Sequence, residues 1–320
     1  MSAERRPDFF IVGAPKGGTT AMYNYLRVHP DLFLPARKEL RFFGADLDIR
    51  DRRSLSLAEY LDCFAEAGDA ARVGTAYVWY LYSRTAAQEI AEFAPGAQII
   101  AMLRNPVEML PALHSENLSN GNEEIADFDA AWEAEVDRRA GRRIPPHAHL
   151  PQGLLYSEVP RYAEQIERYF EAFGRDRVRV ILFDDFRADP ATAYRDTLAF
   201  LGVADDFRPA SFAVMNANRR LRSERLRHFL ARPPEAPRRL IHHLVPRPVR
   251  RGLYDWAKGL NVRSVPRRPL SEATRERIRA AFRDEVTRLS DLLGRDLTSW
   301  SARDELDSST QVSDGEALSP

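Results

Sequence analysis

The stretch Asp8-Phe-Phe-Ile-Val-Gly-Ala-Pro-Lys-Gly-Gly-Thr-Thr20 decides the fold of this chain. Its first half is an apolar run of the kind that forms a buried strand, and a glycine ends it. The following residues, 21–28, carry apolar side chains at helical spacing. A strand, a glycine turn and a helix are the layout of a phosphate-binding loop, because a helix N-terminus presents unpaired N–H groups and a partial positive charge.

The position of the lysine tells which kind of phosphate loop this is. A nucleotide kinase or NTPase would place lysine directly after the second glycine, in the pattern G-x-x-x-x-G-K-[ST]. Gly13 and Gly18 have that spacing, but Thr19 takes the place of the lysine, which lies earlier in the loop at Lys16. The loop is therefore predicted to hold a phosphate without the usual pair of lysine and magnesium ligand. The residues expected to supply backbone and hydroxyl donors are Gly17, Gly18, Thr19 and Thr20.

Strand and helix patterns alternate beyond this loop. Apolar runs predict strands at 72–76, 97–103 and 177–183. Helix patterns fall at 83–93, from 105 onward, at 157–173 and at 190–201. Such alternation predicts an α/β fold, with a parallel sheet flanked by helices on both faces. A further helix is predicted at 271–293, with Ser271 as its N-cap and Gly294 at its end.

The composition is that of a folded protein without a strong charge bias. The chain has 320 residues, 44% of them hydrophobic, with 47 basic and 47 acidic residues. A formal charge of zero does not suit a globally basic nucleic-acid-binding protein, so we expect no nucleic-acid partner. The single cysteine, Cys63, excludes an intramolecular disulfide and a cysteine-based zinc site. Without a signal peptide or a long apolar run, we expect a soluble cytoplasmic protein.

Lysine is rare, and its positions are uneven. Only Lys16, Lys38 and Lys258 are lysines, whereas the other 44 basic residues are arginines. Two of the three lie in the first forty residues, beside a glycine pair and a glutamate. Lysine supplies a compact, mobile charge where arginine supplies a rigid fork. The pattern favours a functional need for lysine at these two positions, with chance as the alternative.

Four segments together resemble one enzyme family. They are Pro15-Lys-Gly-Gly-Thr-Thr20, Lys38-Glu-Leu-Arg-Phe-Phe43, Leu103-Arg-Asn-Pro-Val-Glu108 and Leu292-Leu-Gly-Arg-Asp-Leu-Thr-Ser-Trp300. In this order they are similar to motifs of the sulfotransferases that use 3′-phosphoadenosine 5′-phosphosulfate (PAPS), especially the heparan-sulfate-type and bacterial enzymes. The resemblance implies a P-loop NTPase-like fold. It also implies metal-free transfer of a sulfuryl group from PAPS to a hydroxyl or amine of a carbohydrate, glycolipid or small metabolite.

The resemblance assigns the donor side of the site. Lys16 would stabilise the negative charge that develops on the bridging oxygen of the phosphosulfate. Residues 17–20 would hold the 5′-phosphate, and Arg104, at the end of a strand, would bind the 3′-phosphate. For Arg104 the alternative is a surface salt bridge with Glu108.

The resemblance also assigns the general base. Glu39 matches the catalytic glutamate of the family, and its apolar neighbours Leu40, Phe42 and Phe43 would keep water from its carboxylate. A surface ion pair between Lys38 and Glu39 is the simpler interpretation when the residues are considered without the family.

Other candidates carry less specific signals. His114 is an alternative base, or else a half-buried helix histidine. Arg41 is a candidate for contacting substrate or sulfate. Tyr77 and Trp79 are candidates for stacking on a base or a sugar, although aromatic residues after a strand usually belong to the core.

The sequence departs from the family pattern at three places. The serine usually found after the 3′-phosphate arginine is replaced by Ala112, so Ser115 is a candidate for the missing hydrogen bond. Thr75 stands where related bacterial enzymes often carry glutamate. The late cofactor loop of the family is absent, and Arg263 and Arg267 are the residues of that region that we expect to take its place.

The C-terminal third has a different composition. From Arg219 to Arg251 there are eleven arginines and two acidic residues. This stretch is interpreted as solvated helices, as a wall of an anionic acceptor cleft, or as a surface for peripheral membrane contact. We therefore predict one domain over residues 1–303, with a helical arginine-rich insertion at about 219–260, followed by a disordered acidic tail over 304–320.

Two other functions stay open at this level. A nucleotide kinase or NTPase would use Asp184 and Asp185, which follow an apolar run, as a magnesium site. A nucleotide-binding protein that has lost transfer activity would explain Ala112 and Thr75 as signs of decay.

Overall fold

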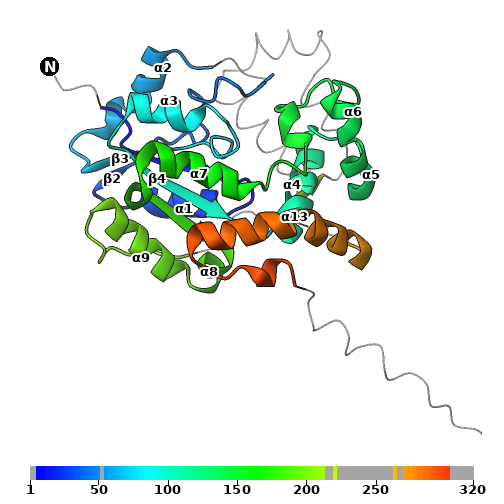
Figure 1. Cartoon of the computed structure of the whole chain (residues 1–320). Coiled ribbons are helices and arrows are strands. Elements are labelled where there is room, and N and C mark those ends of the chain that lie inside the picture. Colours follow the sequence, from blue (N-terminus) through cyan, green and yellow to red (C-terminus); the bar gives the residue numbers. More distant parts are fainter. Residues whose placement is uncertain (1–4, 51–53, 213–218, 222–261, 265–269, 303–320) are drawn as a thin grey trace, which may run out of the picture.

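A computed structural model describes residues 5–50, 54–212, 219–221, 262–264 and 270–302. At its centre is a five-stranded sheet with the strand order β2-β3-β1-β4-β5 (Figure 1). All four strand pairings in this sheet are parallel. The strands are β1 (Phe9–Gly13), β2 (Leu32–Phe33), β3 (Arg72–Ala76), β4 (Gln98–Leu103) and β5 (Val178–Leu182). The predicted α/β class is confirmed, and β2 is a short edge strand that the sequence pattern did not predict.

The sheet separates two hydrophobic cores. In β1, Phe10 and Val12 belong to one core and Phe9 and Ile11 to the other, because successive side chains of a strand point to opposite faces. Every residue of β1 is buried. A strand covered on both faces carries a continuous apolar run, which explains why this segment was recognisable without alternation.

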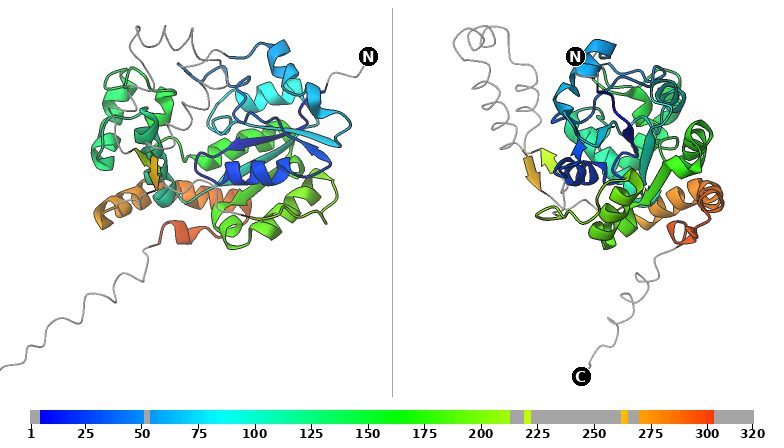
Figure 2. Two further views of the ribbon diagram at one scale, coloured as in Figure 1. Left: turned by 180° about the vertical axis from the view of Figure 1, so that it is seen from behind. Right: turned by 90° about the vertical axis from the view of Figure 1, so that its left-hand side faces the viewer.

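Helices cover both faces of the sheet, in the arrangement of a P-loop NTPase-like fold. Figure 1 looks onto the face covered by α7, and the left view of Figure 2 looks onto the face covered by α1. The helices of the first core are α3 (Ala86–Phe93), α4 (Pro106–Asn120), α7 (Tyr162–Phe173) and α13 (Glu272–Leu293). Those of the second core are α1 (Thr19–Arg27), α8 (Phe183–Ala188) and α9 (Pro190–Leu201). The shorter helices are α2 (Leu57–Asp62), α5 (Phe128–Glu133) and α6 (Glu135–Arg139).

Most predicted helices form, with boundaries set by local chemistry. In α13 the Ser271 side chain accepts a hydrogen bond from the Thr274 N–H, and Gly294 ends the helix with φ 61°, as predicted. The helix predicted from residue 157 begins at Tyr162 instead. Pro160 explains the delay, because proline lacks an N–H and disfavours the helical conformation of the residue before it. Phe183, predicted as the end of a strand, begins α8.

The arginine-rich region is described only at its edges. Its first three residues form β6 (Arg219–Leu221), which pairs antiparallel with β7 (Val262–Ser264). The expectation of a helical insertion from residue 219 is therefore wrong at its start, because a strand partner distant in sequence determines the conformation there. The remainder of the insertion and the predicted tail at 304–320 lie outside the described residues. In the described part of the chain, no helix has the length and apolar character needed to cross a membrane.

Candidate active site

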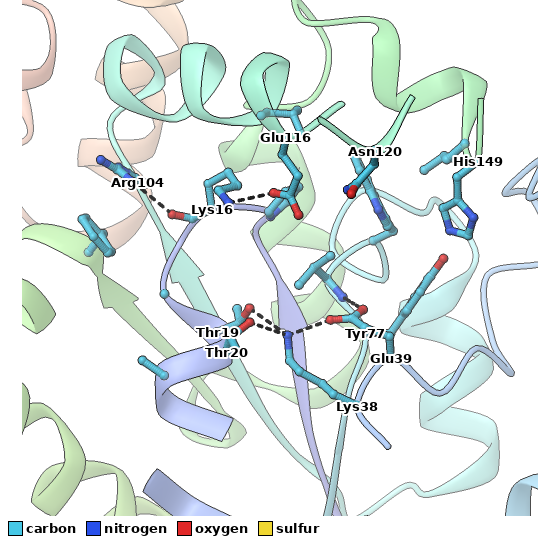
Figure 3. A pocket seen from close by; sticks show the side chains of 18 of the residues that line it. Lys16, Thr19, Thr20, Lys38, Glu39, Tyr77, Arg104, Glu116, Asn120 and His149 are labelled. Carbon is cyan, nitrogen blue, oxygen red and sulfur yellow. Dashed lines mark hydrogen bonds and ion pairs between the residues drawn. The ribbon is translucent and has the colours of Figure 1, made fainter. Parts of the chain in front are cut away.

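A cavity of about 740 Å³ lies where the parallel strands end. Its walls come from segments that directly follow four strands, which include Lys16 after β1, Tyr77 after β3, Arg104 after β4 and Phe183 after β5. Ligands of open α/β sheets bind at this edge, because the loops there and the helix N-termini face the same space. Three of the four segments identified in the sequence, 15–20, 38–43 and 103–108, thus contribute residues to one cavity (Figure 3). The fourth, 292–300, is not among the residues that line it.

The phosphate loop requires its glycines. A Cβ atom on Gly17 would lie 2.2 Å from the carbonyl oxygen of Met102. Gly18 has φ 95°, a left-handed conformation that side chains disfavour, and it precedes the first turn of α1. The loop therefore lies against β4 by its backbone, and Thr19 and Thr20 begin the helix with their side chains at the cavity. These features match a cradle for an anionic group at a helix N-terminus.

Lys16 pairs with a carboxylate on the facing helix. Its Nζ lies 2.7 Å from Oε2 of Glu116, which projects from α4 into the same cavity (Figure 3). The Lys16 side chain is 19% exposed and that of Glu116 is 46% exposed, so the acidic partner is the one free to turn to solvent. Sequence reasoning missed Glu116, because nothing in the local pattern of α4 indicates that it faces the loop.

Lys38 is the second residue that the predicted site lacked. Its ammonium donates to the hydroxyls of Thr19 and Thr20 at 3.3 and 3.2 Å, and to Oε1 of Glu39 at 2.7 Å (Figure 3). It thus links the phosphate loop with the candidate base. The rarity of lysine in this chain had singled out Lys38 without assigning it a role in the site.

Glu39 is held in a fixed orientation at the cavity wall. Its N–H donates to the carbonyl of Ala76 at 3.1 Å, and its Oε2 accepts from the N–H of Val78 at 3.1 Å. With the Lys38 contact, both carboxylate oxygens have donors, and the side chain keeps 35% exposure toward the cavity. Hydrogen bonds to the last residue of β3 and to the segment after it therefore position the carboxylate that the sequence singled out.

Lys16 and Glu39 share an unusual backbone conformation. Their φ angles are 60° and 65°, and Arg143 is the other non-glycine residue of the described chain with positive φ. Left-handed conformations cost free energy for such residues and cluster at functional sites, where the surrounding structure holds them. Both candidate catalytic residues thus lie at strained positions facing one cavity.

The apolar neighbours of Glu39 anchor its loop rather than enclose its carboxylate. The ring of Phe42 stacks on Tyr60 with centroids 4.5 Å apart, and Phe43 belongs to the buried aromatic cluster of the first core. The Tyr80 hydroxyl donates to the carbonyl of Leu40 at 2.8 Å and accepts from the Phe42 N–H. These contacts fix the loop to the domain, so that its polar residues Lys38 and Glu39 point to the cavity.

Arg104 reaches both the phosphate loop and an acidic partner. Its guanidinium donates to Oε2 of Glu108 at 2.7 Å and to the carbonyl of Lys16 at 3.4 Å. It also lies over the ring of Phe183, 4.2 Å from the ring centroid. The salt bridge with Glu108 and a position at the cavity, which sequence reasoning treated as alternatives, are therefore both present.

The other predicted site residues fall into three groups: those that line the cavity, those that do not, and those whose side chains are not described. Arg41, Tyr77 and Trp79 line the cavity, and Arg41 also donates to the Ser54 hydroxyl at 2.6 Å. Ser115 is not among the residues found to line it, and neither is the buried Thr75, a position where the sequence departs from the family pattern. Arg267 lies outside the described residues, and for Arg263 only the backbone in β7 is described.

His114 belongs to the core and not to the cavity wall. It is 5% exposed, its Nε2 lies 2.9 Å from the carbonyl oxygen of Ile125, and its ring makes edge contacts with Phe128 and Tyr156. Burial lowers the pKa of this histidine. The catalytic prediction for His114 therefore has no geometric support, because side-chain packing turns this face of α4 inward.

The acidic pair proposed as a magnesium site is occupied by protein donors. Oδ2 of Asp184 accepts from the indole N–H of Trp300 at 3.2 Å, and Asp185 pairs through both oxygens with Arg295. In the described part of the chain, no cluster of three or more histidine, cysteine or acidic residues is placed to hold a metal. The loop and this pair together lack the features of a magnesium-dependent kinase.

Comparison with known proteins agrees with the site geometry. No family model matches the chain. It is 27% identical over 208 residues to bifunctional heparan sulfate N-deacetylase/N-sulfotransferase 3 of Homo sapiens, and 25% identical over 202 residues to heparan sulfate glucosamine 3-O-sulfotransferase 3A1 of Mus musculus. Each match covers 63% of this chain, but 23% of the first relative and 47% of the second. The chain thus matches less than half the length of either relative.

A solved structure agrees over a larger part of the chain. The sulfotransferase from Alicyclobacillus acidocaldarius superposes with a TM-score of 0.69 and 28% sequence identity, over 93% of this chain and 100% of that one. The sequence relatives and this structure are all sulfotransferases, and the phosphate loop, Glu39 and Arg104 lie together at the strand ends. The chain is thus similar to sulfotransferases in sequence and in fold.

Proposed function

We propose that this protein transfers a sulfuryl group from PAPS to a hydroxyl or amine of an acceptor bound in the cavity. The observation that carries the proposal is the convergence of Lys16 and Glu39, each in a left-handed backbone conformation, on the cavity that contains the phosphate loop. PAPS supplies the activated sulfuryl group. The curated relatives act on heparan sulfate by their names, which supports a carbohydrate among the candidate acceptors.

The donor side is assigned from the loop and the cations around it. Backbone N–H groups of residues 17–20 and the threonine hydroxyls fit the 5′-phosphate. Arg104, at the end of β4, fits the 3′-phosphate through its guanidinium fork. Positive charge fixed around the leaving group, from Lys16 and Lys38, stabilises the transition state because negative charge grows there as the sulfuryl group departs.

The transfer step is a single displacement. The bond between sulfur and the bridging phosphate oxygen breaks, while a bond forms between sulfur and the acceptor oxygen or nitrogen. Glu39 accepts the acceptor proton, since its carboxylate is held at the cavity wall by Lys38 and the Val78 N–H. The leaving oxygen keeps the electron pair of the broken bond, next to Lys16.

Acceptor contacts are proposed for the far wall of the cavity. Arg41, Tyr77 and Trp79 line this space together with the amide side chains of Asn120 and Asn122. Aromatic faces combined with polar groups suit a carbohydrate, a glycolipid or a small metabolite.

We expect the protein to act in the cytoplasm, without a metal and without a nucleic-acid partner. The arginine-rich surface expected to contact membranes lies outside the described residues, apart from the backbone of its ends.

The decisive test measures transfer and donor binding separately. Sulfur-35-labelled PAPS is incubated with the protein and a panel of glycosaminoglycan oligosaccharides, glycolipids and simple alcohols or amines, and labelled products are separated from donor and free sulfate. We expect a labelled product with at least one acceptor class, and thermal stabilisation by 3′,5′-ADP but not by ATP with magnesium. Stabilisation by ATP with magnesium alone would contradict the proposal and favour a kinase.

Two variants distinguish transfer from binding alone. Lys16→Ala and Glu39→Gln should both slow the formation of labelled product by about 10²-fold or more. Labelled product formed at the wild-type rate by both variants would exclude the assigned mechanism, and a wild-type protein that binds 3′,5′-ADP without any turnover would favour a nucleotide-binding protein that has lost activity.

A further inference from the structure

A second arginine lies beside Arg104 at the same end of the cavity. Arg187 projects from α8 and lines the cavity. The two guanidinium carbons lie over one aromatic ring, that of Phe183, at 4.2 Å for Arg104 and 5.9 Å for Arg187. Both also contact Glu108, Arg104 through Oε2 at 2.7 Å and Arg187 through Oε1 at 3.8 Å. A single carboxylate thus bridges two cations that face the same space.

The two arginines together can replace the 3′-phosphate contact that the family serine would make at position 112. The position at which the family supplies a serine is Ala112, which is buried, and Ser115 is not among the residues that line the cavity. A phosphate held by Arg104 alone would have one guanidinium for two negative charges. Arg187 is the neighbouring cation with access to the cavity, and an incoming phosphate would take the place of Glu108, whose side chain is 39% exposed and free to turn to solvent.

The carboxy-terminal motif reaches the same arginine through one carboxylate. Oδ2 of Asp184 accepts from Nε1 of Trp300 at 3.2 Å, whereas Oδ1 accepts from Arg187 at 3.3 Å. Trp300 is 5% exposed, so its ring is fixed by the core. The neighbouring Asp185 is held by two parallel hydrogen bonds from Arg295, one of them at 2.7 Å. A bidentate pair of this kind restrains orientation more than an ordinary surface ion pair does.

We propose that Arg187 is a second phosphate-binding residue for the 3′-phosphate of the donor, and that Trp300 positions it through Asp184. This inference rests on the proposed function. It gives the carboxy-terminal Arg295–Trp300 segment a task in donor recognition: the segment holds α8 so that Phe183 and Arg187 face Arg104. Trp300 is a positioning residue, because it touches Asp184 and not the cavity.

The test compares two nucleotides that differ only in the 3′-phosphate. Binding of 3′,5′-ADP and of 5′-AMP to the full chain is measured by isothermal titration calorimetry for the wild type, Arg187→Gln, Trp300→Phe and the control Arg195→Gln. Arg195 is an exposed arginine on α9 that pairs with Asp196 and does not line the cavity. We expect Arg187→Gln to weaken 3′,5′-ADP binding by about tenfold and to leave 5′-AMP binding unchanged, because a charged hydrogen bond to one phosphate is lost.

Trp300→Phe keeps an aromatic ring in the core but removes the N–H donor. We expect a smaller loss, of about threefold, again only for 3′,5′-ADP. Asp184→Asn should produce a loss of the same selectivity, and it serves as the second variant if Trp300→Phe is unstable. Equal losses for both nucleotides would mean a merely structural role for Trp300 and overturn that part of the inference.

The outcomes separate this inference from the proposed function. A wild type that binds both nucleotides equally, or neither, would contradict the proposed function itself. A wild type that prefers 3′,5′-ADP, together with an Arg187→Gln variant that keeps the full preference, would overturn the assignment of Arg187 alone. If the glutamine variant does not fold, Arg187→Lys replaces it in the test. Lysine keeps the charge but not the guanidinium fork, so this variant should lose part of the preference for 3′,5′-ADP over 5′-AMP.

Discussion

The ammonium of Lys16 lies 2.7 Å from Oε2 of Glu116, so the lysine of the phosphate loop is paired with a carboxylate from the opposite wall of the cavity. An anionic donor has to compete with this carboxylate for the lysine. We therefore expect Glu116→Gln to bind 3′,5′-ADP about two- to fivefold more tightly, the gain available from removing one partly exposed ion pair. Calorimetry at low and high salt measures the effect, which should shrink as salt increases.

Glu124→Gln is the matched control for Glu116, because Glu124 is exposed in the loop after α4 and does not line the cavity. Weaker nucleotide binding in Glu116→Gln than in this control would show that Glu116 supports the loop instead of competing with the donor.

Glu39 should affect turnover and not donor binding. Its carboxylate faces the cavity, whereas the phosphate loop retains Lys16, its glycines and its threonines in the Glu39→Gln variant. We expect a loss in kcat of about 10²- to 10⁴-fold, the usual contribution of a general base, with the affinity for 3′,5′-ADP changed by no more than about twofold. Single-turnover rates with labelled PAPS give the first quantity and calorimetry the second. Glu92→Gln, on the exposed side of α3, provides the control, and a Glu39→Gln enzyme as fast as this control would remove Glu39 from the mechanism.

Gly17 should tolerate no side chain. A Cβ atom there would lie 2.2 Å from the carbonyl oxygen of Met102, so Gly17→Ala must displace the loop from β4. We expect loss of 3′,5′-ADP binding and a lower melting temperature, with a cost in the range of about 1–3 kcal/mol that overpacked positions show. Gly96→Ala is the control, because a Cβ at Gly96 has no heavy atom within 4 Å. Normal nucleotide binding in Gly17→Ala would mean that the loop does not contact the nucleotide through its backbone.

His114 should make stability, but not catalysis, sensitive to acid. Burial lowers the pKa of His114 from its ordinary value of 6.5, so the folded protein keeps it neutral while the unfolded chain takes up a proton. Its contribution is complete above the unfolded pKa and is lost as the pH falls below it, toward the lower folded pKa. We expect the melting temperature of His114→Gln to fall less than that of the wild type between about pH 7 and about pH 5.5.

The same His114→Gln variant tests the catalytic alternative. If it folds and its turnover loses the acid limb of the pH profile that the wild type shows, His114 is the base after all. A turnover profile parallel to that of the wild type is the expected result, because Nε2 of His114 is engaged with the Ile125 carbonyl and the ring does not reach the cavity.

Magnesium should have no effect on donor binding. Both carboxylates at the start of α8 already have protein partners, Trp300 and Arg187 for Asp184 and Arg295 for Asp185. We expect the same melting temperature and the same transfer rate with magnesium and with EDTA. A rate that falls in EDTA and recovers with magnesium would contradict the assignment of these carboxylates to structural roles.

Much of the fold was predictable because its signals are local. A buried strand such as β1 is a run of adjacent apolar residues, and the phosphate loop is a continuous stretch with its own spacing. The ends of α13 follow from a serine and a glycine that cap the helix directly. Local sequence patterns failed where a partner distant in sequence determines the conformation. An example is β6, which pairs with β7 on the other side of the arginine-rich region.

The residues of the candidate site also differ in whether local sequence or distant packing determines their place. Lys16, Glu39 and Arg104 could be named from motifs, because each lies in a short pattern of neighbouring residues. His114 was misleading for the opposite reason: a histidine in a helix can face the cavity or the core, and only the packing of Phe128 and Tyr156 against its ring turned it inward.

The sequence by itself determined the phosphate loop, the parallel α/β layout and the motif lysine, glutamate and arginine, since these depend on the order of neighbouring residues. The tertiary structure alone decided that Lys38 bridges the loop and Glu39, that Glu116 opposes Lys16, and that Trp300 contacts Asp184 across 116 residues of chain. The physical reason is that a hydrogen bond or an ion pair requires atoms within a few ångströms of one another. Only the packing of helices on the sheet brings such distant residues that close.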